Sequence, residues 1–412
     1  MYLATTKLAA AASRGAVTLA VLSVLLLIAA LPAQAQTETV LYNFTGGGDG
    51  GNPQSNLTFD GAGNLYGTTN GGGLFGYGTV FELSPNGSGG WNETLLYSFT
   101  GGTDGAFPSD TVILDSVGNL YGTAGGGITG WGVVFELSPV EEGWTETVLY
   151  LFGSTPGDGL QPASGVMMDA TGNLYGATAF GGSVNYGTIY EMSPSGGGWT
   201  EQTIYNFDGR GPFDYNTGFT MDAAGNIFGV SRQTITELSP NGNGGWNASV
   251  IFNFPNARGY FPNRTIVTDQ SGNLYGTTSV GTAKGGLGGY GTVFRLSPRK
   301  KGGTWSRKVL YAFEGEGNGD GNDPFGEIVF DAAGNIYGTT AYGGEYGDGT
   351  VFELVTPVDK SKGYTEKVLW SFNGTDGETP VGGLILDSAG NIYGTTYSGG
   401  LYGWGVAFEV TP

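Results

Sequence analysis

Apolar and polar positions alternate in short runs along most of the chain, and the runs recur as one unit. In the copy at Ser109–Phe152, Thr111–Leu114 is a short apolar strand, followed by a polar Asp-x-x-Gly-Asn turn. A second strand begins at Leu120, and after a Gly-rich loop the sequence GVVFELSP predicts a third strand that ends at proline. The sequence WTETVLYLF, with its alternating aromatic residues, predicts a fourth strand. Each copy therefore predicts four antiparallel strands that are apolar on both faces.

The turn recurs seven times along the chain. Its aspartates are Asp60, Asp115, Asp169, Asp222, Asp269, Asp331 and Asp387, and successive ones are 47 to 62 residues apart. A repeat of this length without helical periodicity is in the size range of a propeller blade. A blade is covered on both sides by its neighbours, which agrees with two apolar faces. The sequence therefore predicts an all-β, seven-bladed β-propeller of four-stranded antiparallel blades.

The two ends of the repeated region complement each other. TETVLYNF (Thr37–Phe44) has the pattern of a fourth strand with no first three before it, and the final GVAFEVTP has the pattern of a third strand with no fourth after it. Pairing them would close the ring and remove two exposed strand edges. We therefore expect the N-terminal strand to complete the last blade.

The first 35 residues have a different composition from the rest. Lys7 and Arg14 precede the apolar run Ala16–Leu31, and Ala33-Gln34-Ala35 follows it. This layout is typical of a secretory signal peptide that is cleaved before Gln36. The sequence thus predicts a signal peptide at 1–35, a single propeller domain at 36–412, secretion to the periplasm or the cell exterior, and no membrane span after cleavage.

Composition narrows the chemistry that this protein could perform. The chain of 412 residues has no cysteine and no histidine, and its formal net charge is −20. Disulfides, thiolate chemistry and a histidine base are therefore excluded. The negative charge argues against nucleic-acid binding. An enzyme built from these residues would need a carboxylate pair, or tyrosine with arginine and an acid.

Residues that recur in every copy are predicted to serve the fold, because a catalytic residue is needed only once. The aromatic residue of the second strand is expected to pack between neighbouring blades; its copies are Tyr66, Tyr121, Tyr175, Phe228, Tyr275, Tyr337 and Tyr393. The third strand carries an acid in six copies: Glu82, Glu136, Glu191, Glu237, Glu353 and Glu409, with Arg295 in the remaining one.

The Asp-x-x-Gly-Asn-Leu/Ile-Tyr turn resembles that of NHL-type propeller repeats. The fuller unit GNLYGTT-x-GG-x-YGTVFELSP closely resembles the GloVer tandem repeat of exported bacterial proteins that are described as choice-of-anchor. The resemblance covers nearly all of Thr37–Pro412. It implies a secreted propeller and assigns no activity.

Function is best sought where the copies differ. The fourth copy has lost its Gly-rich loop, and Gln36–Gly209 contains no Lys or Arg. Four arginines are expected near the shortened loop, on the face that carries the longer loops, and two tyrosines could stack on a ligand there: Arg210, Arg232, Arg258, Arg264, Tyr215 and Tyr260. The arginines either bind an anionic group or pair with local acids such as Asp208 and Asp214.

Other differences between the copies suggest further candidate site residues. Asp110 and Glu327 are non-repeated acids near the channel-side ends of first strands. Aromatic residues that end the Gly-rich loops could bind carbohydrate or simply pack: Tyr77, Trp131, Tyr186, Tyr290 and Trp404. Asn318, Asp320 and Asn322 alternate as in a calcium loop. However, Asp323 takes the place of the required glycine, and Val329 that of the final glutamate.

We expect a secreted, monomeric binding or scaffold module for an anionic or carbohydrate ligand on the loop-rich face. Its partner would be a glycan, another small anionic ligand or a cell-surface component, with no catalytic residue, metal or cofactor assigned. The alternatives are a polysaccharide-active or lyase-type enzyme that uses carboxylates, and a structural or adhesive surface protein. The propeller fold cannot decide among them, because it hosts unrelated activities.

Overall fold

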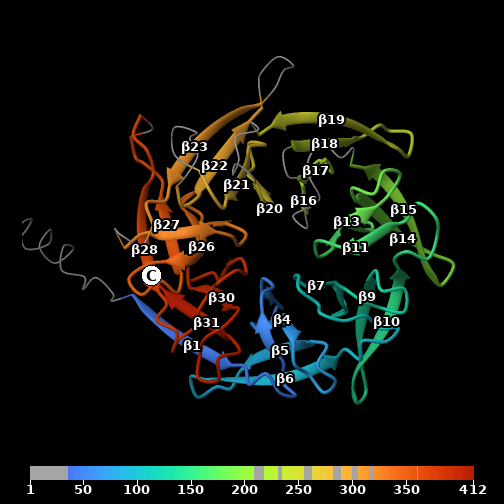
Figure 1. The fold of residues 1–412 in the computed structure, drawn as a ribbon, viewed down its shortest axis with the longest axis horizontal. Helices are drawn as coiled ribbons and strands as arrows, with labels where there is room; N and C mark the ends of the chain where they lie inside the picture. Colours follow the sequence, from blue (N-terminus) through green and yellow to red (C-terminus); the bar gives the residue numbers. More distant parts are fainter. Residues whose placement is uncertain are drawn as a thin grey trace, which may run out of the picture.

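The described residues form seven small antiparallel sheets arranged as a ring (Figure 1). The computed structural model describes residues 36–207, 218–230, 234–254, 262–281, 289–298, 305–315, 319–359 and 361–412. In these ranges, no helix has both the length and the apolar character that crossing a membrane requires. The chain is a seven-bladed β-propeller, as the repeat predicts.

In each blade, the strands follow one another in order from the central channel to the rim (Figure 1). The first three blades contain, in turn, β2 (Gly51–Pro53), β3 (Thr58–Phe59), β4 (Leu65–Gly71), β5 (Thr79–Pro85) and β6 (Trp91–Ser98); β7 (Ile113–Leu114), β8 (Leu120–Ala124), β9 (Val133–Val140) and β10 (Gly143–Leu151); β11 (Gly159–Pro162), β12 (Met167–Met168), β13 (Leu174–Gly181), β14 (Thr188–Ser195) and β15 (Gly198–Asn206). The next three contain β16 (Gly218–Met221), β17 (Ile227–Val230), β18 (Thr234–Pro240) and β19 (Trp246–Asn253); β20 (Pro262–Thr268), β21 (Leu274–Thr278), β22 (Thr292–Ser297) and β23 (Ser306–Ala312); β24 (Gly321–Pro324), β25 (Val329–Phe330), β26 (Ile336–Gly343), β27 (Thr350–Val355) and β28 (Thr365–Ser371). The last blade contains β29 (Ile385–Leu386), β30 (Ile392–Thr396), β31 (Val406–Thr411) and β1 (Thr37–Asn43).

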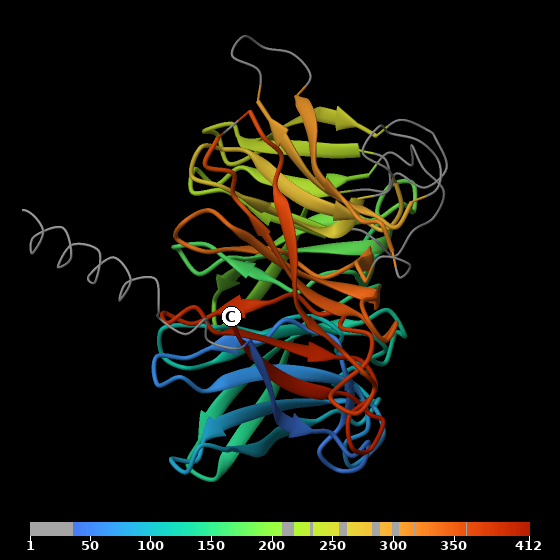
Figure 2. The same ribbon diagram turned by 90° about the vertical axis from the view of Figure 1, so that its left-hand side faces the viewer.

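The ring closes through β1, which is the outermost strand of the last blade. It pairs antiparallel with β31, and Val40 lies opposite Phe408. The side chain of Leu41 and that of Phe44, just after the strand, are buried in the adjoining core. Figure 2 shows the ring from its rim, with β1 in blue beside the red strands of the last blade. The predicted closure is confirmed.

The first strand of a blade is shorter than the sequence pattern predicts. Of the predicted strand Thr111–Leu114, only Ile113–Leu114 is paired, as β7. In three blades the first strand is split into two pieces. The piece that comes earlier in the chain ends in a proline: Pro53, Pro162 and Pro324. Proline has no N–H to continue a ladder, so the pairing stops there.

The repeated turn is held together by its aspartate. In the second blade, Asp115 Oδ1 accepts hydrogen bonds from the backbone N–H groups of Val117 and Asn119, each 2.9 Å long. The Tyr121 hydroxyl donates to Asp115 Oδ2 at 3.2 Å, and the Tyr121 ring lies in the core between this blade and the next. The same Tyr–Asp bond recurs at Tyr66, Tyr175, Tyr275, Tyr337 and Tyr393. The core role predicted for the repeated tyrosine is confirmed.

The repeated acid of the third strand also serves the blade. Glu136 accepts hydrogen bonds from the hydroxyls of Tyr121 (3.3 Å) and Ser138 (3.1 Å). Glu353 forms an ion pair with Lys367 at 2.8 Å. These contacts lie within one blade, as expected of a residue that keeps its role around the ring.

The glycine after each repeated tyrosine is needed for close packing. A Cβ added to Gly122 would lie 2.6 Å from Cζ of Phe135, whose side chain is fully buried. We expect Gly122→Val to lower the free energy of unfolding by about 1–3 kcal/mol, because a filled core cannot accept the extra atoms. Urea denaturation would measure the change. Gly61→Val is the matched control, since a Cβ at Gly61 meets no atom within 4 Å; equal losses for both variants would contradict this explanation.

Candidate ligand-binding site

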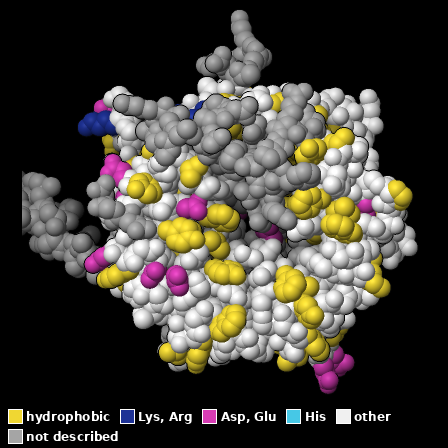
Figure 3. Space-filling view, in the orientation of Figure 1, with side chains coloured by type: hydrophobic (Ala, Val, Ile, Leu, Met, Phe, Trp, Pro, Cys, Tyr) yellow, Lys and Arg dark blue, Asp and Glu magenta, His cyan; other side chains and the backbone are white. Residues whose placement is uncertain are grey.

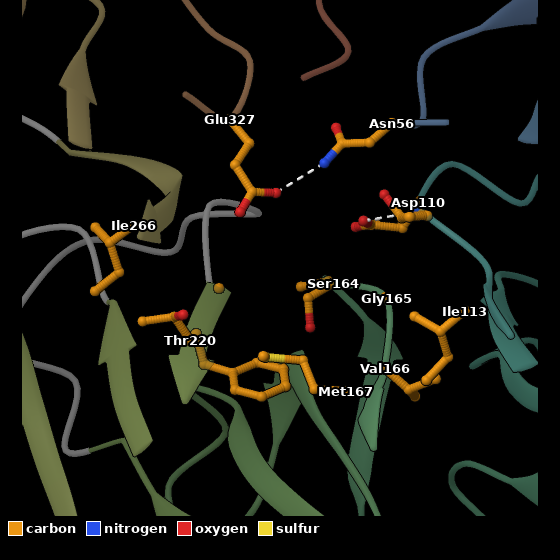
Figure 4. A pocket seen from close by; sticks show the side chains of 14 residues that line it. Asn56, Asp110, Ile113, Ser164, Gly165, Val166, Met167, Thr220, Ile266 and Glu327 are labelled. Carbon is orange, nitrogen blue, oxygen red and sulfur yellow. Dashed lines mark hydrogen bonds between the residues drawn. The ribbon is translucent and has the colours of Figure 1, made fainter. Parts of the chain in front are cut away.

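A pocket in the central channel brings together Asn56, Asp110 and Glu327 from three different blades (Figure 4). Asn56 and Glu327 occupy the same position of the repeat in the first and sixth blades, four residues before Asp60 and Asp331. Asp110 reaches the pocket from the segment that leads into β7. The structure thus places the two acids singled out by sequence, Asp110 and Glu327, beside one cavity.

Asn56 fixes the orientation of Glu327. Its side-chain nitrogen donates a hydrogen bond to Glu327 Oε2 at 2.7 Å, and its side-chain oxygen accepts one from the backbone N–H of Gly383 at 2.6 Å. Residue 383 must be small, because a Cβ there would lie 2.7 Å from Cβ of Glu327. Both polar ends of Asn56 are therefore occupied, and only its nitrogen faces the carboxylate.

Electrostatics make Glu327 unlike a surface glutamate. Burial raises the pKa of Glu327 to about 7; the hydrogen bond from Asn56 counteracts part of this rise, and the charge of Asp110 adds to it. Asp110 itself accepts a hydrogen bond of 3.0 Å from the backbone N–H of Thr111. Near neutral pH, the carboxyl of Glu327 can thus be either ionised or protonated.

The rest of the pocket is mainly apolar. The cavity encloses about 220 Å³ and lies open on one side. Thr220 and Ser164 add hydroxyl groups to its wall. The apolar lining residues are Ile113, Ala163, Val166, Met167, Phe219 and Ile266. Among the described residues that line it, none is Lys or Arg. A small ligand here would meet acids on one side and hydrocarbon on the other.

Aromatic side chains lie partly exposed in loops of the loop-rich face. We call Tyr77, Trp131, Tyr290 and Trp404 the aromatic collar; they end the loops between the second and third strands of four blades. Their side chains stay 38% to 46% exposed. Figure 3 shows hydrophobic side chains spread around a central hollow on this face, with acidic atoms visible at the hollow.

The collar rings are held by the neighbouring loop. The Trp404 ring lies on Gly46, where an added Cβ would be only 2.4 Å from it, and the backbone oxygen of Trp404 accepts a hydrogen bond from Asn52 N–H at 2.8 Å. Trp131 packs in the same way on Gly153. Asn52 has a positive φ of 56°, an uncommon conformation for a residue other than glycine. Each ring therefore packs with one face and presents the other to solvent.

Several predicted site residues lie outside the described part of the chain. These are Arg210, Arg232, Arg258, Tyr215 and Tyr260. Arg264 belongs to β20, but its side chain is likewise outside the description. The predicted anion site therefore stays a prediction. Among the predicted collar aromatics, Tyr186 is only half-buried and lies in the loop between β13 and β14.

Sequence reasoning missed Asn56, although a signal for it was available. Aligning the copies on the turn aspartate places Asn56 directly over Glu327, so a polar residue at this channel position could have been recognised. The exposed loop residues Phe75 and Tyr402, 56% and 54% exposed, were missed as well. They precede the collar residues Tyr77 and Trp404 by two positions.

The calcium prediction rests on residues with other contacts. Asp320 accepts hydrogen bonds from the Tyr311 hydroxyl at 2.9 Å and from the backbone N–H of Glu314 at 2.6 Å. Asn318 lies outside the described residues. Within the described ranges, no group of three or more acidic side chains is placed to hold a metal ion.

Comparison with solved structures shows the fold. The extracellular domain of a hybrid two component system from B. thetaiotaomicron is similar with a TM-score of 0.57 and 12% sequence identity, covering 92% of this chain and 42% of that chain. The extracellular domain of a one component system from the same organism has a TM-score of 0.55 and 12% identity, covering 88% of this chain and 40% of that one. The chain thus spans less than half the length of either protein. No curated protein matches its sequence.

The sequence also matches a repeat family along most of its length. The Gloeobacter/Verrucomicrobia repeat is found over residues 28–239 and again over 231–412. These two matches include all seven copies of the turn, and they agree with the resemblance noted from the sequence. The chain therefore belongs to the Gloeobacter/Verrucomicrobia repeat family.

Proposed function

We propose that this propeller is an exported binding module that takes carbohydrate on its loop-rich face. The observation that carries the proposal is the aromatic collar, whose rings are exposed on one side and supported on the other. Export is supported by the predicted signal peptide at 1–35 and by the description of the two similar structures as extracellular domains.

Carbohydrate suits this face better than other ligands do. The C–H face of a sugar ring can pack on an aromatic ring while the sugar hydroxyls remain in water. The supported rings lose little freedom on binding, which lowers the entropic cost. A strand of nucleic acid could also stack on aromatics, but the chain's net charge of −20 would repel it.

Replacing a collar tryptophan should weaken binding of a neutral polysaccharide. We expect Trp131→Ala and Trp404→Ala each to raise Kd about fivefold, since an aromatic contact contributes roughly 1 kcal/mol. Affinity electrophoresis in gels that contain glucans, mannans or xylans would identify the polysaccharide, and calorimetry would then give Kd.

The matched control is Val140→Ala, which removes an exposed apolar side chain (49% exposed) from the end of β9. It should leave Kd unchanged. If no polysaccharide retards the wild-type protein, or if Val140→Ala weakens binding as much as Trp404→Ala does, the proposal is wrong. Reducing-end assays on the same mixtures would detect hydrolysis and so support the enzyme alternative.

A further inference from the structure

Five junctions between neighbouring blades share an uncommon backbone conformation. Among the described residues, six other than glycine have a positive φ, and five of these occupy the same place in the repeat, directly before a proline. We call them the junction residues: Asn52, Phe107, Gln161, Asp323 and Thr379, with φ between 54° and 57°. Because the five differ in size and polarity, the conformation belongs to the junction and not to one residue type.

The collar of the preceding blade fixes this conformation. The backbone N–H of Phe107 donates a hydrogen bond of 2.7 Å to the backbone oxygen of Tyr77, and the same bond, 2.7 to 2.9 Å long, recurs at the other four junctions. The proline that follows packs on the glycine after the collar position, since a Cβ added to Gly78 would lie 2.7 Å from Cδ of Pro108. The backbone is thus held by groups that do not depend on the junction side chain.

A side chain at this position is strained. Positive φ is uncommon for residues other than glycine and is least tolerated by a β-branched residue such as Thr379. Glycine adopts it without strain, and the chain has 81 glycines, yet none of the five junctions has one here. Strain of this kind is concentrated at binding and catalytic sites, where the side chain has a role beyond the fold.

The junctions differ in what they offer a ligand. Phe107 packs against the Tyr77 ring, with ring centroids 5.5 Å apart, and adds no polar group. Thr379 is bonded through its N–H to Asp348, which stands where other blades have a collar ring. Asp323 adjoins a loop that is only partly described. None of these three junctions therefore combines a described tryptophan with an amide group.

Two junctions do pair a tryptophan with an amide. Asn52 adjoins Trp404, and its side-chain nitrogen donates a hydrogen bond to the backbone oxygen of Tyr397 at 2.9 Å. Gln161 adjoins Trp131 and is half-buried, and its amide makes no hydrogen bond with the described residues. The Asn52 oxygen likewise accepts none from them. An amide can both donate to and accept from a hydroxyl group.

We propose that the junction residues set the specificity of the collar, with Asn52 and Gln161 bonding to hydroxyl groups of a neutral sugar that is stacked on Trp404 and Trp131. The choice of carbohydrate rests on the proposed function. Stacking accepts many sugar rings, whereas an amide held in one place distinguishes hydroxyl groups by their position. The absence of Lys and Arg from Gln36–Gly209 agrees with a neutral sugar rather than an anionic one.

Calorimetry with cellohexaose, mannohexaose and xylohexaose tests the proposal, because these chains differ in their hydroxyl groups. The wild-type protein should prefer one of them more than tenfold. Asn52→Gly and Gln161→Gly should each lower this preference about fivefold, through the loss of one hydrogen bond. Trp131→Ala, in contrast, should weaken binding of all three by a similar factor, since stacking does not distinguish them.

The glycine variants also separate binding from folding. Gln161→Gly should keep or raise Tm, because glycine adopts a positive φ without strain. Thr379→Gly is the matched control: it makes the same change of backbone beside Asp348 instead of a ring, so the sugar preference should stay as in the wild type. A clear fall in Tm for Gln161→Gly would show that the side chain serves the fold, and would overturn the proposal.

The remaining outcomes distinguish this inference from the proposed function. If Trp131→Ala weakens binding but the glycine variants keep the wild-type preference, the junction proposal fails and the collar proposal stands. Equal binding of the three hexasaccharides by the wild type would have the same meaning. If no hexasaccharide binds and no polysaccharide retards the protein, both proposals are wrong.

Discussion

A protein that lacks residues 37–44 should aggregate or lose most of its thermal stability. Without β1, the edge of β31 is exposed, with unpaired N–H and C=O groups along Val406–Thr411. The core also loses Leu41 and Phe44, both buried. Truncating one such side chain costs about 2–5 kcal/mol, so the combined loss is comparable to the stability of a typical domain.

Size-exclusion chromatography and thermal melts of the truncated chain would check this. Leu41→Ala with Phe44→Ala is an informative comparison, because it removes the same side chains and keeps the backbone ladder. It should melt earlier than the wild type but remain monomeric. A synthetic peptide of residues 36–44, added during refolding, should restore part of the stability of the truncated chain. A soluble truncated chain with an unchanged Tm would show that closure does not support the ring.

Stability should fall as the pH rises from about 4.5 to 8. Five glutamates on outer strands lie between blades, each near an aspartate from an adjacent loop: Glu38 near Asp376, Glu93 near Asp49, Glu146 near Asp104, Glu201 near Asp158 and Glu366 near Asp320. Burial, and then the neighbouring aspartate, raise the pKa of Glu38 to about 8 and that of each of the other four to about 7.

The direction of this pH dependence follows from comparing proton binding in the folded and unfolded states. The folded protein keeps these protons up to about pH 7, whereas the unfolded chain releases them near pH 4.5. The stabilisation is therefore complete below pH 4.5 and is lost as the pH rises through the folded pKa values. Each glutamate contributes about 1 kcal/mol after allowance for its partial exposure, so the five together contribute on the order of 5 kcal/mol.

A second set of acids limits stability at low pH. Burial disfavours the charge of the turn aspartates, but hydrogen bonds such as those from Asn64 to Asp60 outweigh it and lower the pKa. The same holds for Asp115, Asp169, Asp269 and Asp387. Their contribution is present above pH 3.8 and is lost as the pH falls below it. Maximal stability is thus expected near pH 4–5.

Thermal melts from pH 3 to pH 9 would test this profile. Glu93→Gln with Glu146→Gln should flatten the alkaline side, since an amide keeps the shape and carries no charge. Glu141→Gln with Glu142→Gln, on an exposed turn, should leave the profile as it is. A Tm that rises steadily from pH 5 to pH 8 would contradict the interpretation.

The fold could be predicted because every blade repeats the same short-range contacts. The turn aspartate, the tyrosine and the third-strand acid each contact residues of their own copy, so one copy reveals the role of all. The length of the first strand could not be predicted, because its pairing stops at prolines in some blades and at the bends beside the channel.

The candidate site was only partly predictable. Asp110 and Glu327 stood out because other copies lack them, but their meeting at one pocket depends on the angular positions of the second and sixth blades. The pair of Asn56 and Glu327 joins residues 271 positions apart, which no local pattern records. The exposure of the collar depends on how each loop packs against the next, as Trp404 does on Gly46.

The pairing of β1 with β31 has a consequence for the order of folding. Thr37 lies opposite Thr411, so the first strand to be synthesised must wait for the last residues before it finds its partner. At ordinary rates of synthesis, this delay is about 20–70 s. During that time, Thr37–Asn43 is an unpaired strand that other chains could pair with. Its exposed positions carry Thr37 and Thr39, polar residues that disfavour such pairing.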